Sequence, residues 1–139
     1  MSTHLREKEE KILQTLDWLA LESSKGIPII VEGKKDVEAL RALTIKGKII
    51  EAKTRGKSML EVISEVGECG VSEVILLLDF DRRGREWTKR LKQHLEKMQI
   101  KPNTVFWKKL LGLVSHEVKD VEGLASYMET LKKKICTST

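Results

Sequence analysis

The sequence has few of the residues that build zinc sites or disulfide frameworks. It contains two cysteines, Cys69 and Cys136, and three histidines among 139 residues. Neither cysteine has a CxxC neighbour and no His or Cys cluster accompanies them, which excludes an intrinsic zinc ribbon or zinc finger. A disulfide framework is also disfavoured, and the reducing cytosol is the expected compartment.

Long apolar segments are absent as well. No apolar run approaches the roughly 20 residues that a helix needs to cross a bilayer. The first ten residues mix acidic and basic side chains, without the apolar core of a signal peptide. We therefore expect a soluble, cytoplasmic protein that has no membrane partner.

The composition is that of an ordinary globular domain with a basic excess. Hydrophobic residues make up 40% and charged residues 34% of the chain, whose 139 residues fit one domain with one core. Lys and Arg exceed Asp and Glu by 26 − 21 = 5, and the sequence pI is about 9.2. This excess is compatible with a polyanionic partner but does not establish one.

Five consecutive apolar residues, Val74 to Leu78, are followed at once by two aspartates. Such a run is typical of a strand buried on both faces of a parallel sheet. Because side chains alternate along a strand, we expect Asp79 and Asp81 to lean the same way at its carboxyl end, where open α/β sheets hold ligands. Two interpretations are open: the pair binds Mg²⁺ or Mn²⁺, or it caps the following helix.

Apolar periodicity and turn residues divide the chain into alternating helices and strands. The expected order is helix 3–22, strand 27–31, helix 37–43, strand 48–52, helix 58–67, strand 71–79, a long helix after Gly84, strand 104–107 and helix 121–134. The alternation predicts a single α/β domain with about four mainly parallel strands between helices.

Three parts of the chain have distinct expected roles. Residues 1–25 form an N-terminal helix packed on the domain, residues 26–134 form the domain itself, and residues 135–139 form a disordered tail. Residues 100–103 break the long helix, since they include Pro102. Ser58 and Glu61 have the capping-box pattern that opens a helix.

A further acidic residue follows another expected strand. Glu32 ends a β-branched run, Gly33 lets the backbone turn sharply, and Asp36 starts the next helix, which it is more expected to cap than to bind metal. If the two strands are neighbours, Glu32, Asp79 and Asp81 converge. Such a group suits divalent-metal chemistry on a phosphodiester, with the two aspartates holding Mg²⁺ and Glu32 as a proton shuttle or further ligand.

Two segments around these acids resemble the motifs of the Toprim domain family. Residues 31–40, VEGKKDVEAL, resemble the first motif: a strand, Glu-Gly, two variable residues, Asp and a helix. Residues 78–86, LDFDRRGRE, resemble the second, Asp-x-Asp-x-x-Gly, and include Gly84. The resemblance covers roughly residues 26–130. It implies a Toprim (Rossmann-like) fold with Mg²⁺ held by the acids and with Gly33, Asp36 and Gly84 in structural roles.

Departures from the family narrow the implied function. Topoisomerases usually carry a third acid where this chain has Arg83, and they need a nucleophilic tyrosine, whereas Tyr127 lies inside an expected helix. The zinc domain of complete primases is absent. The chain looks closest to the primase and rRNA-maturation-nuclease branch, and its size resembles small stand-alone Toprim proteins of archaea and bacteria.

Basic residues follow the expected strands and would gather at the same face as the acids. They are Lys34, Lys35, Arg55, Lys57, Arg82, Arg83, Arg85, Lys108 and Lys109. We expect them to hold phosphates of RNA or DNA, with weak sequence preference, although solvation of the loops is the alternative. An aromatic content of 4% makes base stacking doubtful as a main source of affinity.

Two functions remain open from the sequence. The first is a Mg²⁺-dependent nuclease or phosphotransferase in which Glu32 is the general acid or base. The second is a module that binds metal and nucleic acid without turnover, or a partner within a larger nucleic-acid-processing complex. His116 beside Glu117 could donate a proton or bind metal, but an isolated surface histidine is more often neither.

Overall fold

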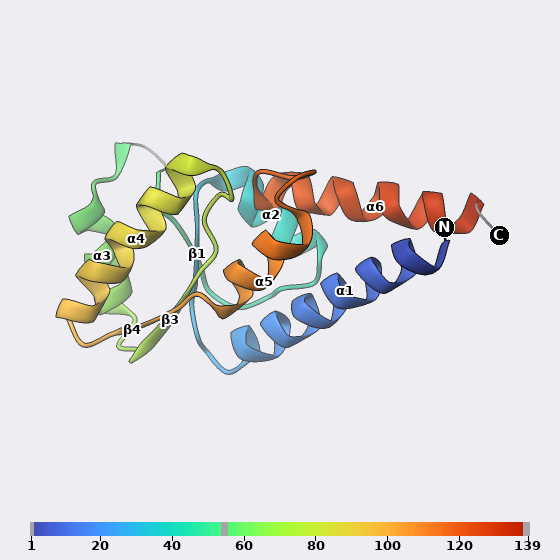
Figure 1. Ribbon diagram of the computed structural model, residues 1–139. Helices are drawn as coiled ribbons and strands as arrows, with labels where there is room; N and C mark the ends of the chain where they lie inside the picture. Colours follow the sequence, from blue (N-terminus) through green and yellow to red (C-terminus); the bar gives the residue numbers. More distant parts are fainter. Residues whose placement is uncertain (1, 54–55, 138–139) are drawn as a thin grey trace.

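The structure is a computed structural model, which describes residues 2–53 and 56–137 (Figure 1). Its elements are α1 (Ser2–Ser24), β1 (Ile29–Val31), α2 (Lys34–Ala42), β2 (Ile49–Glu51), α3 (Met59–Glu68), β3 (Glu73–Leu76), α4 (Arg82–Lys97), β4 (Lys101–Asn103), α5 (Val105–Val114) and α6 (Val121–Thr137). Within the described residues, four strands form one parallel sheet in the order β2-β1-β3-β4. The predicted α/β fold is confirmed.

The two faces of the sheet bury different sets of helices. Side chains alternate along β1 and β3, so Ile29 and Ile75 face one side while Ile30 and Leu76 face the other. The first side packs against α1, α2, α5 and α6, and the second against α3 and α4. Figure 1 shows these two layers on opposite sides of the strands. Burial on both faces explains why the central strands are continuously apolar.

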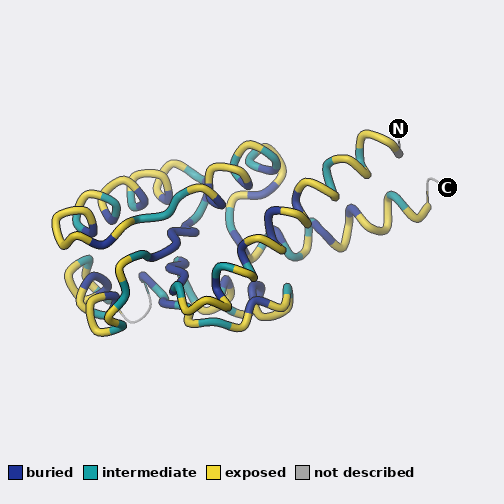
Figure 2. Tube along the Cα trace, turned by 90° about the horizontal axis from the view of Figure 1, so that it is seen from below, coloured by how far each residue is buried: buried dark blue, intermediate teal, exposed yellow. Residues whose placement is uncertain are grey.

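The N-terminal helix extends from the sheet beside α6 (Figure 2). Its side chains Ile12, Leu16 and Leu19 are buried in the same core as β1 and β3, as their spacing predicts. Trp18 lies off this stripe, and its ring meets Phe106 of the same core edge-on, at a centroid distance of 4.7 Å.

The capping box at the start of α3 is present. The Ser58 hydroxyl oxygen accepts a hydrogen bond from the Glu61 amide at 3.2 Å, and the Glu61 carboxylate accepts one from the Ser58 amide at 3.3 Å. Each bond satisfies an amide that has no partner inside the helix. Ser58 therefore fixes where α3 begins.

The expected strand at residues 104–107 is wrong. These residues open α5, and the fourth strand is instead β4, which includes Pro102. Proline is tolerated there because β4 is an edge strand that pairs only with β3, so its missing amide breaks no inner ladder. A short run of β-branched and aromatic residues does not by itself separate a strand from a buried helix.

The last helix is longer than expected. It continues to Thr137, so residues 135–137 are helical, and Ile135 packs against the core. The remaining two residues of the expected tail, 138–139, lie outside the described residues. Among the residues that the structure describes, no helix combines the length and apolar character needed to span a bilayer.

Candidate functional site

An acidic hollow lies at the carboxyl ends of β1 and β3. The acidic hollow is lined by nine residues: Glu32, Gly33, Lys34, Lys35, Asp36, Lys53, Asp79, Asp120 and Glu122. Five of these nine carry carboxylates and three carry ammonium groups. The hollow therefore collects negative charge at the edge where parallel sheets hold ligands.

The neighbouring positions of β1 and β3 bring Glu32 and Asp79 together. Ile29 pairs with Ile75 and Ile30 with Leu76, so both strands end at the same edge. The Asp79 amide donates to Glu32 Oε2 at 3.4 Å, although 47 residues separate the two in the chain. The acids of the two motifs therefore meet because their strands are neighbours in the sheet.

Asp81, which we expect to lean with Asp79, has a second role at the start of α4. It is the N-cap residue of α4, where its Oδ1 accepts a hydrogen bond from the Gly84 amide at 2.9 Å. It is not among the residues that line the acidic hollow. The regular strand ends at Leu76, so simple strand alternation no longer determines where Asp81 points.

The backbone around Asp79 is held from three sides. The Trp107 indole donates to the Leu78 carbonyl at 2.9 Å, the Phe80 amide donates to the Lys119 carbonyl at 2.6 Å, and Arg85 Nε donates to the Phe80 carbonyl at 3.0 Å. These bonds fix the segment after β3 without a strand partner. No pattern in the sequence singles out Trp107 for this role.

Gly84 lies where the start of α4 approaches the Asp79 backbone. A Cβ added at Gly84 would lie 2.0 Å from the Asp79 carbonyl oxygen. Since that neighbour is backbone rather than a flexible side chain, a larger residue would have to displace the segment. The motif glycine thus allows the close contact between helix and acid.

Asp36 joins the first motif to the last helix. Its carboxylate accepts hydrogen bonds from the Gly33 amide at 3.1 Å and from the Glu122 amide at 2.9 Å. Burial raises the pKa of Asp36, and these two backbone bonds oppose that rise. Asp120 caps α6 by accepting from the Gly123 amide at 2.7 Å. The start of α6 is therefore part of the wall of the hollow.

The surroundings of the hollow raise the pKa of Asp79 strongly. Burial, followed by the nearby carboxylates of Glu32, Asp36, Asp120 and Asp81, raises the pKa of Asp79 to about 7. At neutral pH this carboxyl is therefore poised between its two protonation states.

Glu32 has a cationic partner that sequence reasoning did not single out. Lys53 Nζ lies 3.0 Å from Glu32 Oε1. The available signal was position: Lys53 comes two residues after the end of β2, as Glu32 directly follows β1, and the Lys53 amide donates to the Glu32 carbonyl at 2.9 Å. The sequence pattern singles out Arg55 and Lys57 instead, because both follow the expected strand 48–52.

The expected basic residues do not share one location. Lys34 and Lys35 line the acidic hollow, and Arg82 and Arg83 are exposed in the first turn of α4. Lys57 pairs with Glu65 of α3 and with the Glu51 carbonyl, and Arg85 has the backbone contact described above. Arg55 lies outside the described residues.

Lys108 and Lys109 do not ring the acids as expected. Both belong to α5 and line a separate hollow with Lys11 and Gln14 of α1. The expectation failed because it placed them in a loop after a strand, whereas the chain is helical there. The Lys109 ammonium lies 5.9 Å from the centroid of the Trp18 ring.

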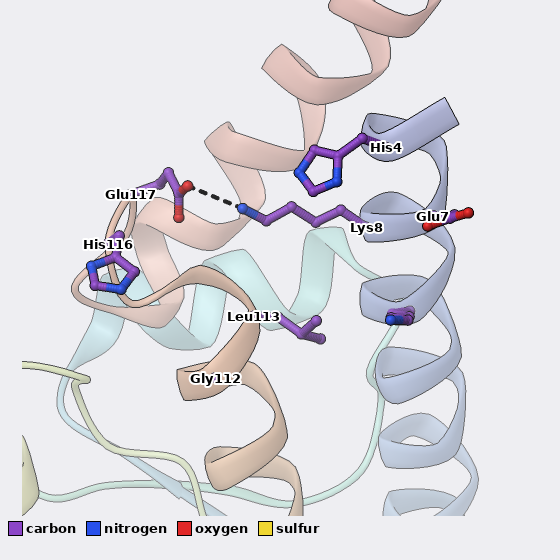
Figure 3. Close-up of a pocket in the computed structure, with 8 residues that line it drawn as sticks. His4, Glu7, Lys8, Gly112, Leu113, His116 and Glu117 are labelled. Carbon is purple, nitrogen blue, oxygen red and sulfur yellow. Dashed lines mark hydrogen bonds and ion pairs between the residues drawn. The ribbon is translucent and has the colours of Figure 1, made fainter. Parts of the chain in front are cut away.

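His116 is not among the residues that line the acidic hollow. It lines a hollow between α1 and the segment after α5, together with His4, Lys8 and Glu117 (Figure 3). Lys8 Nζ and Glu117 Oε1 form an ion pair across this hollow at 3.0 Å. This hollow shares no residue with the acidic hollow. A neighbouring hollow is lined by both His116 and Asp120, and Asp120 also lines the acidic hollow.

The donor set suits a hard divalent cation, but no three-residue cage is formed. Among the described residues, no group of three or more His, Cys, Asp or Glu side chains is arranged to hold a metal ion. Glu32 and Asp79 nevertheless offer two adjacent carboxylates. Mg²⁺ is commonly bound by one or two carboxylates, with water and substrate phosphate completing its coordination, so these residues fit that ion.

Comparison with known proteins gives concordant results. Residues 27–110 match the Toprim domain family. A UPF0292 protein of Methanocaldococcus jannaschii is 39% identical over 120 residues, covering 86% of this chain and 91% of the relative. A UPF0292 protein of Methanosarcina acetivorans is 36% identical over 129 residues, covering 93% and 88%.

A solved structure shares the fold. A protein from Aquifex aeolicus superposes with a TM-score of 0.66 at 25% sequence identity, covering 79% of this chain and 94% of that one. Both acidic motifs, at residues 31–40 and 78–86, lie within the matched region of the sequence. The chain belongs to the Toprim domain family.

Proposed function

We propose that this protein is a Mg²⁺-dependent enzyme that acts on phosphodiester bonds of RNA or DNA, as a nuclease or phosphotransferase. Membership of the Toprim family supports a metal-dependent function related to nucleic acid. The observation that carries the proposal is the meeting of Glu32 and Asp79 at the carboxyl ends of β1 and β3, in a hollow with lysines in its wall.

Asp79 and Glu32 would hold the divalent cation, with Asp81 close by at the start of α4. The ion, when bound, would polarise a phosphoryl oxygen and stabilise the charge that develops on it. Mn²⁺ would serve in the same place, since it also prefers oxygen ligands. Glu32 is the residue we assign as general acid or base, because its carboxylate lies beside Asp79 in the wall of the hollow.

The basic side chains near the hollow would bind the nucleic-acid backbone. Lys34 and Lys35 lie in its wall, and Arg82 and Arg83 extend from the first turn of α4. Contacts of this kind position a strand without reading its bases. We therefore propose binding to RNA or DNA with weak sequence preference.

The test is a cleavage assay with Mg²⁺ and with Mn²⁺ on single- and double-stranded RNA and DNA. We expect wild type to yield products that Glu32→Gln and Asp79→Asn do not. Glu38→Gln, an exposed carboxylate of α2, is the matched control and keeps the wild-type rate. Circular dichroism checks that each variant is folded. Cleavage at the wild-type rate by both site variants would refute the proposal.

A binding function without turnover is the second candidate. The absence of a three-acid metal cage among the described residues favours it, as does the use of Asp81 as a helix cap. Such a module would bind metal and nucleic acid, or serve a larger nucleic-acid-processing complex. A gel-shift assay run beside the cleavage assay separates the two: retarded nucleic acid without products from any substrate would favour the module.

A further inference from the structure

Lys53 is fixed beside Glu32 by both its backbone and its side chain. Its amide donates to the Glu32 carbonyl at 2.9 Å, and its Nζ lies 3.0 Å from Glu32 Oε1. The side chains are 29% and 12% exposed for Lys53 and Glu32, so water screens this pair only in part. The ammonium therefore lies at ion-pair distance from a carboxylate that is largely shielded from solvent.

The same ammonium has a second neighbour on α4. Lys53 Nζ lies 4.8 Å from the centroid of the Trp87 ring, and Trp87 is half-buried against the core. The face of a tryptophan ring attracts a cation at this distance. The lysine head group thus has a favourable contact that does not depend on Glu32.

A divalent cation at Glu32 would meet the charge of Lys53. Like charges a few ångströms apart repel strongly where water is partly excluded. Both cations would compete for the oxygens of Glu32, since Lys53 already occupies one of them. Retreat of the ammonium along the Trp87 ring would relieve the repulsion without sending the lysine into solvent.

We propose that Lys53 is a resident counter-cation, a positioning residue that holds Glu32 in the metal-free protein and yields that carboxylate to a divalent cation while staying on Trp87. This inference rests on the proposed function, which places the cation at Glu32 and Asp79. Lys53 then sets the metal concentration at which the site becomes loaded.

The first test measures Mn²⁺ binding by titration calorimetry. Lys53→Gln removes the competing charge, so we expect it to bind Mn²⁺ about tenfold more tightly than wild type. Lys48→Gln is the matched control: it removes the same charge from the opposite end of β2, where Lys48 is exposed, and keeps wild-type affinity. Trp87→Leu removes the second seat of the ammonium and is expected to weaken Mn²⁺ binding.

A second readout needs no metal. In chelator, Lys53→Gln should melt at a lower temperature than Lys48→Gln, because Glu32 loses its partner beside Asp79. Adding Glu32→Gln to Lys53→Gln should restore the melting temperature. In proteins that already carry Glu32→Gln, the further change Lys53→Gln should leave the Mn²⁺ affinity unaltered. Such coupling is what distinguishes a pair from two independent effects.

The outcomes separate this inference from the proposed function. Wild type that binds Mn²⁺ no more weakly than Lys53→Gln would overturn the role of Lys53 and leave the metal site standing. Equal affinity in Trp87→Leu and wild type would overturn the role of the ring. Failure of both wild type and Lys53→Gln to bind Mn²⁺ would overturn the inference and the proposed metal site together.

Discussion

At the scale of single residues, the acidic hollow brings carboxylates close together, and Asp79 carries most of the resulting cost. Its carboxyl is half-buried and faces the charges of Glu32, Asp36 and Asp120. Of these three carboxylates, Glu32 is the one whose charge Lys53 offsets. Such repulsion between carboxylates is common in ligand sites, because binding of a cation or a proton relieves it.

Asp79 makes stability depend on pH. Its pKa in the folded protein, about 7, exceeds its ordinary value of 3.8, so folding favours the protonated form. Its favourable contribution is complete below about pH 4 and is lost as pH rises through 7. In metal-free urea denaturation, wild type should lose more free energy of unfolding between pH 5 and 8 than Asp79→Asn. Asp17→Asn, exposed on α1, should follow wild type; parallel profiles for all three proteins would contradict this assignment.

Gly84 and Gly112 form a matched pair of helical glycines. Gly84→Ala would press a methyl group against the Asp79 carbonyl and should lower the free energy of unfolding by about 1–3 kcal/mol. Gly112 has open space around its Cβ position in α5, so Gly112→Ala should raise it by up to about 1 kcal/mol. Urea denaturation measures both changes, and equal effects would show that the close contact is not limiting.

Sequence patterns located some residues of the site and could not locate others. Glu32 and Asp79 each follow an apolar run, so the topology of a parallel sheet was enough to predict that they approach one another. The Asp36–Glu122 hydrogen bond spans 86 residues, and no local pattern announces it. Lys53 acquires its partner only through the pairing of β1 with β2.

At the scale of elements, α4 combines two functions at its first turn. Asp81 caps the helix, and Arg82 and Arg83 lie directly after it, so one turn presents an anion and two cations near the hollow. The sequence left metal binding and capping open for the aspartate pair. In the structure Asp81 caps α4, while Asp79 does not and instead faces the other acids.

Substitutions at Asp81 can separate capping from charge. Asp81→Ala removes the acceptor for the Gly84 amide and should lower the free energy of unfolding by about 1 kcal/mol. Asp81→Asn keeps an oxygen acceptor and should remain near wild type in urea denaturation. If Asp81 also contributes to a metal site, Asp81→Asn will weaken Mn²⁺ binding in calorimetry while its stability is unchanged. Equal stability of the Ala and Asn variants would argue against the cap.

Elements with strong local signals were predictable, and the remainder depended on packing. The capping box of α3 and the apolar stripe of α1 are local, and both are present in the structure. The error at 104–107 arose because tertiary contacts decide that segment. Phe106 packs against Trp18, and the Trp107 indole bonds to the Leu78 carbonyl, which a helix starting at Val105 allows.

At the scale of the whole molecule, charge is distributed unevenly. The net charge is +5, yet the hollow gathers five carboxylates. A polyanion would therefore meet repulsion at the acids and attraction at the surrounding cations, unless a divalent ion is present. The division into a helix 1–25 and a domain 26–134 stays a prediction, and α1 shares its core with the sheet.

Nucleic-acid binding should depend steeply on salt if the exposed arginines of α4 contact phosphates. The double variant Arg82→Gln and Arg83→Gln should weaken binding on all sequences and reduce the slope of log affinity against log salt by about 2. Fluorescence anisotropy with a labelled oligonucleotide at several salt concentrations measures this. Lys132→Gln with Lys133→Gln, on exposed parts of α6, is the control for net charge. An equal slope change in both pairs would point to nonspecific charge.

The hydrogen bond between Asp36 and the Glu122 amide has a consequence for transplanting the site. The family match ends at residue 110, whereas Asp120 and Glu122 belong to the start of α6. A graft of residues 27–110 onto another scaffold would carry every motif acid. It would lack the Glu122 amide, which is one of the two amides that donate hydrogen bonds to the buried carboxylate of Asp36. The minimal portable unit therefore extends past the two acidic motifs to include the first turn of α6.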